Sequence, residues 1–516
     1  MKRSWWWIAL VVLLRLGQCA LAEATRPVAD QQVISPADLL DPAVFPGAQF
    51  GMAVESAQED ADRASTVTTG AQIIIDRPSD TIEIHQRLPR ARPVARLKLA
   101  AGSLSQLTIT HRSDGAAIFS GGGTIVRVNG DSLIMVRMGI PGRITAELLF
   151  TPDYFAHFKG SYNFFDPYGG ISFFEHAQQP HSLLSARRDP VTISWQFESN
   201  QVFWAAVSPP KPFDWNASIR QRIVLHGSSH DRYFYPSDLS ILRWHQFAGA
   251  TMLLLHNENM WRHWQLEHVP KNLDEYLRVM RTAHELGMKV LVYGGPKHFL
   301  KGTIAEDRAV PDVNDPRATG WRSGSNAHEF LRQATRLVRQ FQTDGFYFDE
   351  MYTNHEALAT NYYVARASRQ LVGDNGPLVL HCTEDTLGDR RGPIGVTHCP
   401  TIHAYFTAIV KGEAAGDMTD APYLRYVLCT YNISNTVGMQ HIDDRIIPTA
   451  EKLNRWVSRA NLRFRTPEHF FFTGDIEVLR RCYWPRLTPQ LKQELEPGLL
   501  EPTGAFEAYR RSINAE

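Results

Sequence analysis

The chain has 516 residues, of which 43% are hydrophobic and 21% are charged, and this composition excludes a disordered or fibrous protein. Its 54 Lys and Arg residues balance its 54 Asp and Glu residues, so neither a nucleic acid nor an anionic membrane surface is indicated as a partner. A chain of this length exceeds one ordinary hydrophobic core, and we expect two or three domains.

The start of the chain predicts a cleaved signal peptide over residues 1–22. Lys2 and Arg3 precede the apolar run Trp5–Leu14, and a small-x-small cleavage signal ends at Ala22. The apolar run is too short for a standard membrane span. Cys19 allows a lipoprotein anchor, but the residue before it fits that signal poorly. We therefore expect a secreted or periplasmic protein without stable membrane insertion, and lipoprotein anchoring is the less favoured alternative.

The cysteines that remain after cleavage all lie in the C-terminal third of the chain: Cys382, Cys399, Cys429 and Cys482. An exported protein can oxidise them, although their pairing is open. They lack the short spacings of a zinc site, so structural thiols or one disulfide are the simpler interpretation.

Residues 23–227 predict a β-sandwich domain. Short segments alternate apolar and polar residues, as strands with one buried face do, and turn signals such as Asn129-Gly130 separate them. The predicted strands cover residues 71–76, 81–85, 95–100, 106–111, 124–128 and 132–137. Many short strands of this kind are typical of a sandwich.

After residue 228 strands and helices alternate. A helix over 239–248 precedes a buried strand over 251–256, and an amphipathic helix over 272–286 precedes a strand over 289–294. Asn272 and Glu275 have the spacing of an N-cap and its reciprocal partner, and Gly287 suits the helix end.

The same unit recurs with a helix over 326–341, a strand over 346–349, a helix over 357–371 and a strand over 378–383. Alternation of this kind implies parallel strands joined by crossover helices. We predict a (β/α)8, TIM-like barrel over 228–470, with a doubly wound open sheet as the alternative. Residues 471–516 are expected to form an extension that packs on the barrel.

Polar side chains follow the predicted barrel strands, where barrel enzymes place their chemistry. Asp349 ends a run of aromatic residues, and a carboxylate there is expensive to bury without a role or a partner. The main strand-end candidates are His256, Glu258, Tyr293, Lys297, Asp349, Glu350, His381, Glu384, Asp385 and His403. Trp261 and Trp264 lie in a polar loop and could stack on the apolar faces of sugar rings, with Tyr347, Tyr352 and Tyr405 as further aromatics.

The segment Asp344–Glu350, placed at a central strand end of an exported two-domain chain, resembles the broad α-galactosidase and α-amylase-like group of glycoside hydrolases. In that group the nucleophile is an aspartate that ends the fourth barrel strand. The resemblance implies a carbohydrate substrate, a barrel fold and the nucleophile role for Asp349 alone.

Glycoside cleavage needs a second carboxyl group as acid, and we favour Glu384, with Asp385 and Glu258 in reserve. A retaining mechanism is the leading hypothesis, with His256 and His381 orienting substrate hydroxyls. The remaining binding candidates are Tyr293, Lys297, Trp261, Trp264 and His403. No cofactor and no metal ion are expected.

Three alternatives stay open. Asp349 and Glu350 could serve substrate-assisted cleavage of an N-acetylhexosaminide, although adjacent strand residues point to opposite faces. A metal-dependent hydrolase would use His256, Asp349, His381 and His403, but the HxH and HExxH spacings are missing. A non-catalytic carbohydrate-binding protein is the third alternative.

Overall fold

A computed structural model of the chain describes residues 34–152, 154–158, 161–166, 168–174, 182–188, 191–212, 223–226, 235–256, 260–263, 267–295, 298–300, 309–311, 318–321, 327–348, 358–381, 400–410, 436–442 and 470–473. The predicted signal peptide, the four remaining cysteines and residues 474–516 of the predicted extension lie outside these ranges. No helix within them is long and apolar enough to cross a membrane.

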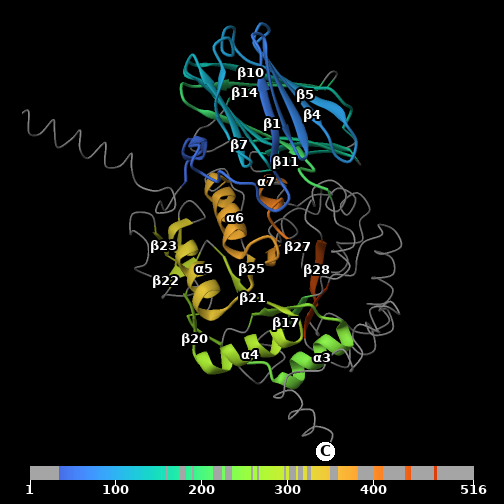
Figure 1. The fold of residues 1–516 in the computed structure, drawn as a ribbon, viewed down its shortest axis with the longest axis vertical. Coiled ribbons are helices and arrows are strands. Elements are labelled where there is room, and N and C mark those ends of the chain that lie inside the picture. Colours follow the sequence, from blue (N-terminus) through green and yellow to red (C-terminus); the bar gives the residue numbers. More distant parts are fainter. Residues whose placement is uncertain are drawn as a thin grey trace, which may run out of the picture.

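The N-terminal part consists of a short 3-10 helix, η2 (Asp38–Leu40), and two antiparallel eight-stranded sheets (Figure 1). The first sheet contains, in spatial order, β1 (Val54–Glu59), β2 (Arg63–Thr68), β3 (Ala71–Asp76), β4 (Thr81–Gln86), β5 (Arg92–Lys98), β10 (Gly142–Leu148), β15 (Val191–Phe197) and β14 (Ser182–Arg188). The second contains β11 (Tyr154–Phe158), β12 (Ser161–Asp166), β13 (Gly169–Phe174), β16 (Val202–Ser208), β9 (Leu133–Arg137), β8 (Thr124–Asn129), β7 (Ala116–Gly121) and β6 (Thr108–Arg112).

The two sheets share one apolar core, as the sandwich prediction requires. Ile73 and Ile84 of the first sheet belong to the same buried cluster as Phe119 and Phe203 of the second. In β3 buried and half-buried residues alternate strictly, which is the burial pattern expected when one face of a strand meets the core and the other meets water.

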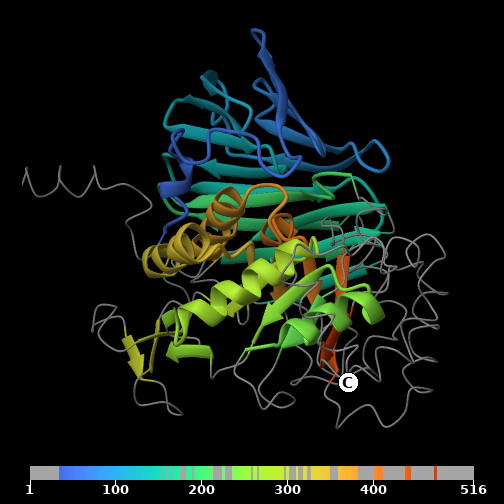
Figure 2. The same cartoon turned by 60° about the horizontal axis from the view of Figure 1, so that its bottom comes forward.

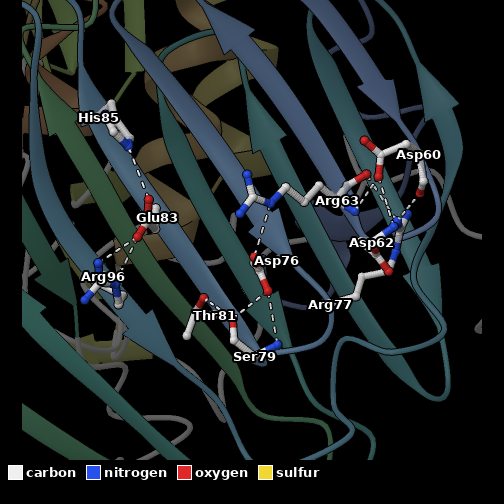
Figure 3. Close-up of polar contacts among 10 residues, drawn as sticks. All are labelled: Asp60, Asp62, Arg63, Asp76, Arg77, Ser79, Thr81, Glu83, His85 and Arg96. Atoms are coloured by element: carbon white, nitrogen blue, oxygen red, sulfur yellow. Dashed lines mark hydrogen bonds and ion pairs between the residues drawn. The ribbon is translucent and has the colours of Figure 1, made fainter.

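The outer face of the first sheet carries charged side chains from the alternate positions (Figure 3). Arg63 pairs with Asp76 on the neighbouring strand at 3.2 Å, and Arg96 pairs with Glu83 at 2.7 Å. Such exposed pairs each contribute about 0–1 kcal/mol, so they fix strand register and solubility more than stability.

Eight parallel strands follow and close into a barrel, because the last strand pairs with the first. In order they are β17 (Ile223–His226), β18 (Met252–Leu255), β21 (Lys289–Gly294), β25 (Gly345–Phe348), β26 (Leu378–His381), β27 (Ala408–Val410), β28 (Thr436–Ile442) and β29 (Phe470–Thr473). The alternative of an open doubly wound sheet does not agree with this pairing. β17 belongs to the barrel although it precedes residue 228, where we predicted that the barrel begins.

Helices stand between the first barrel strands: α3 (Asp238–Ala248), α4 (Leu273–Glu285), α5 (Ala327–Phe341), α6 (Leu358–Val372) and the single turn α7 (Pro400–His403). The connections after β27 and β28 lie outside the described residues, so a complete (β/α)8 pattern stays a prediction. Two small antiparallel sheets, which we did not predict, are β19 (Trp261–His263) with β20 (Glu267–Pro270), and β22 (His298–Leu300) with β24 (Ala318–Trp321) and β23 (Ala309–Pro311).

The ends of α4 confirm most of the capping prediction. The side chain of Asn272 accepts a hydrogen bond from the Glu275 backbone N–H, and Gly287 has a left-handed φ of 70° after the last turn. The reciprocal half of the predicted capping box is wrong. The Asn272 N–H donates to the hydroxyl of Tyr235 instead, while the Glu275 carboxylate accepts from Arg278.

The sandwich and the barrel also share a buried cluster, and Figure 2 shows the second sheet lying along the helices that precede β26 and β27. Trp204 of β16 packs edge-on against Tyr362 of α6, with ring centroids 5.5 Å apart. The two parts of the chain therefore meet through packed side chains.

Candidate active site

The carboxyl ends of the barrel strands lie at one edge. In the register, His226 is paired with Leu255, Gly294 with Phe348, and His381 with Val410. Parallel pairing thus brings the residues that follow these strands to the same mouth of the barrel.

The barrel interior is lined by every second strand residue. A buried cluster separate from the main core contains Ile223, Met252, Leu254, Leu291, Tyr293, Tyr347 and Val379. Intervening residues such as Phe346 and Phe348 belong instead to the outer core, where Phe348 packs on Phe330 of α5 with ring centroids 5.2 Å apart. The side-chain period of two therefore sorts each strand into inward and outward positions.

Three rings form a row toward the carboxyl edge of this interior. Tyr293 stacks on Tyr347, with centroids 5.4 Å apart and planes at 23°. His256 follows β18 directly, is half-buried, and meets Tyr293 edge-on at 4.1 Å. The His256 backbone N–H donates to the carbonyl of His226 at 2.9 Å, which continues the sheet ladder to this residue. Among the predicted site residues, the structure brings His256 and Tyr293 together.

His268 supports this row from outside the barrel. Its Nε2 lies 2.5 Å from the carbonyl oxygen of Tyr293, and its Nδ1 lies 3.3 Å from the side-chain oxygen of Gln333 on α5. Its ring also fills the space beside Gly294, where a Cβ would come within 2.8 Å of the imidazole. Burial lowers the pKa of His268, so charging it is disfavoured. His268 was not predicted from the sequence, because apolar and polar residues do not alternate in Glu267–Pro270, the strand β20 that carries it.

Two further predicted binding residues, besides Tyr293, are buried. Trp261 is 1% exposed and packs against His268 and Tyr276, with ring centroids 5.4 and 5.6 Å away. His403 ends the short helix α7 and is 0% exposed. Both residues therefore belong to the packed interior. A sugar could stack on Trp261 only if the Trp261 side chain left that core.

The remaining predicted site residues lie outside the described residues: Glu258, Trp264, Lys297, Asp349, Glu350, Glu384 and Asp385. His381 is described only as the last backbone position of β26. In the sequence Asp349 comes directly after Phe348, the last residue of β25.

Within the part of the chain that the structure describes, no group of three or more His, Cys, Asp or Glu residues is arranged to hold a metal ion. The ligand set of the metal-dependent alternative includes Asp349, which lies outside the described residues.

No known protein family matches the sequence, and no curated protein matches it either. Several solved glycoside hydrolases align with the structure at low TM-scores. A GH31-family sulfoquinovosidase from E. rectale aligns with a TM-score of 0.41 and 10% identity, over 86% of this chain and 84% of that one. The glucosidase II alpha subunit aligns with a TM-score of 0.40 and 9% identity, over 90% of this chain and 61% of that one. TtGalA, an α-galactosidase from Thermus thermophilus, aligns with a TM-score of 0.37 and 12% identity, over 74% of this chain and 98% of that one.

Proposed function

We propose that this protein is a secreted glycoside hydrolase whose active site lies at the carboxyl edge of a (β/α)8 barrel, with Asp349 as the nucleophile. The observation that carries the proposal is the alternation in β25. Tyr347 faces the barrel interior, whereas Phe346 and Phe348 face the outer core. Asp349 follows Tyr347 by two positions in the sequence, the spacing of residues on one face of a strand, and this spacing supports its proposed role.

The same alternation separates the two adjacent carboxylates. Position 350 shares the parity of Phe346 and Phe348, which pack outward against α5. An N-acetylhexosaminidase mechanism needs both Asp349 and Glu350 at the substrate, and the parity disfavours that arrangement. The second carboxyl group therefore comes from another strand in our proposal.

Glu384 is the proposed acid. It follows β26, the barrel neighbour of β25, and Phe348 is paired with Leu380 in the register. Val379 of β26 faces the interior, and Glu384 lies in the connection that follows this strand in the sequence. Carboxyl groups about 5–5.5 Å apart would give retention, whereas a gap of about 6.5–9.5 Å would admit water and give inversion. Asp385 and Glu258 remain the reserves for this role.

The ring row would bind the substrate. Tyr293 and Tyr347 supply an apolar wall at the base of the mouth, and the half-buried His256 is placed above Tyr293 to hydrogen-bond a hydroxyl group. Trp264 and Lys297 are proposed to complete the subsite from the connections after β18 and β21.

A screen of aryl glycosides and polysaccharides tests the proposal, using wild type, Asp349→Asn and the matched control Glu350→Gln. We expect the wild type to cleave at least one glycoside, Asp349→Asn to lose that turnover, and Glu350→Gln to retain most of it. Failure of the wild type across a broad panel, or loss of turnover in Glu350→Gln alone, would contradict the assignment. A metal requirement revealed by chelation would favour the metal-dependent alternative.

A further inference from the structure

A turn of the sandwich inserts a carboxylate into the contact with the barrel. Asp131 lies between β8 and β9 and is 2% exposed. Its Oδ1 accepts from the backbone N–H of Leu133 at 3.2 Å, which fixes the side chain on its own turn. Gly130 allows the turn to approach closely, because a Cβ there would come within 2.9 Å of the backbone of Ala53.

The other carboxylate oxygen of Asp131 accepts hydrogen bonds from the hydroxyl groups of two barrel tyrosines. Tyr362 of α6 donates to Asp131 Oδ2 at 2.8 Å, and Tyr405, which follows α7, donates to the same oxygen at 2.6 Å. Both tyrosines are 1% exposed. Burial raises the pKa of both phenols, so they stay protonated and remain donors.

Two arginines complete the network. Arg366 Nη1 donates to the hydroxyl of Tyr362 at 2.8 Å, and Asn129 Nδ2 donates to that hydroxyl at 2.9 Å. Arg127 Nε in turn donates to the side-chain oxygen of Asn129 at 2.7 Å. The charge of Asp131 is therefore balanced by buried cations through hydrogen-bonded intermediates, which a buried carboxylate needs.

The two tyrosines belong to the two segments that return from the proposed catalytic connections. The connection after β25 begins with Asp349 and leads into α6, and the connection after β26 contains Glu384 and leads into α7. Each connection thus begins at a barrel strand and leads to a segment whose tyrosine donates a hydrogen bond to Asp131.

We propose that Asp131 is a positioning residue that sets the relative placement of the two catalytic connections by holding Tyr362 and Tyr405 together. This inference rests on the proposed function, and it gives the sandwich a part in catalysis without substrate contact. Small displacements of reacting groups are expensive: about 1 Å can lower the rate on the order of a hundredfold.

The test compares wild type, Asp131→Asn, Tyr405→Phe and the matched control Tyr276→Phe. Tyr276 is also a fully buried tyrosine of the barrel, and its hydroxyl lies 2.7 Å from Thr343 Oγ1, away from Asp131. Tyr405→Phe removes one hydrogen bond and keeps all charges, so it replaces Asp131→Asn if that variant does not fold.

Amide hydrogen exchange tests, without any substrate, whether Asp131 holds Tyr362 and Tyr405 in place. We expect faster exchange in peptides covering α6 and residues 400–410 for Asp131→Asn and Tyr405→Phe, and unchanged exchange there for Tyr276→Phe. Unchanged exchange in the Asp131 and Tyr405 variants would show that the hydrogen bonds to Asp131 do not hold these segments in place.

Turnover tests whether Asp131 positions the two catalytic connections. Assayed well below the lowest Tm, the Asp131 and Tyr405 variants should lose at least tenfold in kcat with KM within about twofold, whereas Tyr276→Phe should lose stability alone. Faster exchange with normal kcat would overturn the role in catalysis. The proposed function fails separately, if Asp349→Asn turns over like the wild type.

Discussion

Tyr293 and Tyr347 lie on adjacent barrel strands and stack inside the barrel with ring planes 23° apart. Both belong to the small interior cluster that the outer core does not reach. The stack joins β21 and β25, and in the sequence Lys297 follows the first of these strands while Asp349 and Glu350 follow the second.

Truncation of this stack should destabilise the protein strongly. Tyr347 is 6% exposed, and Tyr347→Ala should lower the free energy of unfolding by about 3–5 kcal/mol because it leaves a cavity between strands. The control is Tyr168→Ala in the sandwich, where the ring is 46% exposed and the expected change is within about 0.5 kcal/mol. Denaturant unfolding measures both variants, and equal effects would contradict the packing described here.

Gly345 begins β25, and the backbone of Pro377 lies too close to it to leave room for a side chain. A Cβ on Gly345 would lie 1.7 Å from the carbonyl oxygen of Pro377, and that oxygen accepts from the Phe346 N–H at 3.1 Å. Gly345→Ala should therefore separate β25 from β26 and lower stability by about 3 kcal/mol or more. Gly47→Ala, where no atom lies within 4 Å of the added Cβ, is the control. Thermal unfolding that shows the two variants equally stable would contradict this prediction.

At the amino end of β25, Asp344 links stability to pH. Burial alone would raise its pKa, but hydrogen bonds from His284 and the Val290 N–H, together with nearby Lys289, hold the pKa below its ordinary value. A depressed carboxyl pKa contributes stability that is present above the unfolded pKa of about 3.9 and is lost as pH falls through the folded pKa.

We therefore expect Asp344→Asn to lower the Tm near pH 6, by an amount equivalent to about 1–3 kcal/mol. The difference from wild type should shrink as the pH falls below about 4, where Asp344 itself becomes protonated. Calorimetry at several pH values measures the difference in Tm between Asp344→Asn and the wild type. A difference that stays constant down to pH 3 would show that the charge of Asp344 has no part in it.

The bounds of two strands were predictable from the sequence. Ala71–Asp76 and Lys289–Gly294 have the predicted bounds, because alternation or a continuous apolar run reports directly on which faces are buried. β17 (Ile223–His226) was not predicted from the sequence.

The contacts that join the two parts were not predictable. Asp131 is separated from Tyr362 by 231 positions and from Tyr405 by 274, and nothing local to any of the three residues signals the partner. Of the site, the sequence indicates the strand ends, but the inward orientation of Tyr293 and Tyr347 depends on register across strands. The burial of Trp261 likewise depends on Tyr276 of α4, which packs against it.

His256 should contribute to binding more than to chemistry. Its half-buried ring stands over Tyr293, and we expect His256→Ala to raise KM about two- to tenfold, the value of one neutral hydrogen bond, with kcat nearly unchanged. His85 of the sandwich, also half-buried, provides the control His85→Ala, for which neither constant should change. Steady-state kinetics on the glycoside found by screening decide between these outcomes. A large fall in kcat for His256→Ala would assign this residue to the chemical step instead.

The most direct measurement of the central claim is the turnover and affinity of wild type and Asp349→Asn on one cleaved glycoside. We predict that Asp349→Asn lowers kcat about a thousandfold or more, because the nucleophile is lost, while calorimetric titration gives a Kd close to that of the wild type. Retained turnover in Asp349→Asn would contradict the account, whatever its affinity.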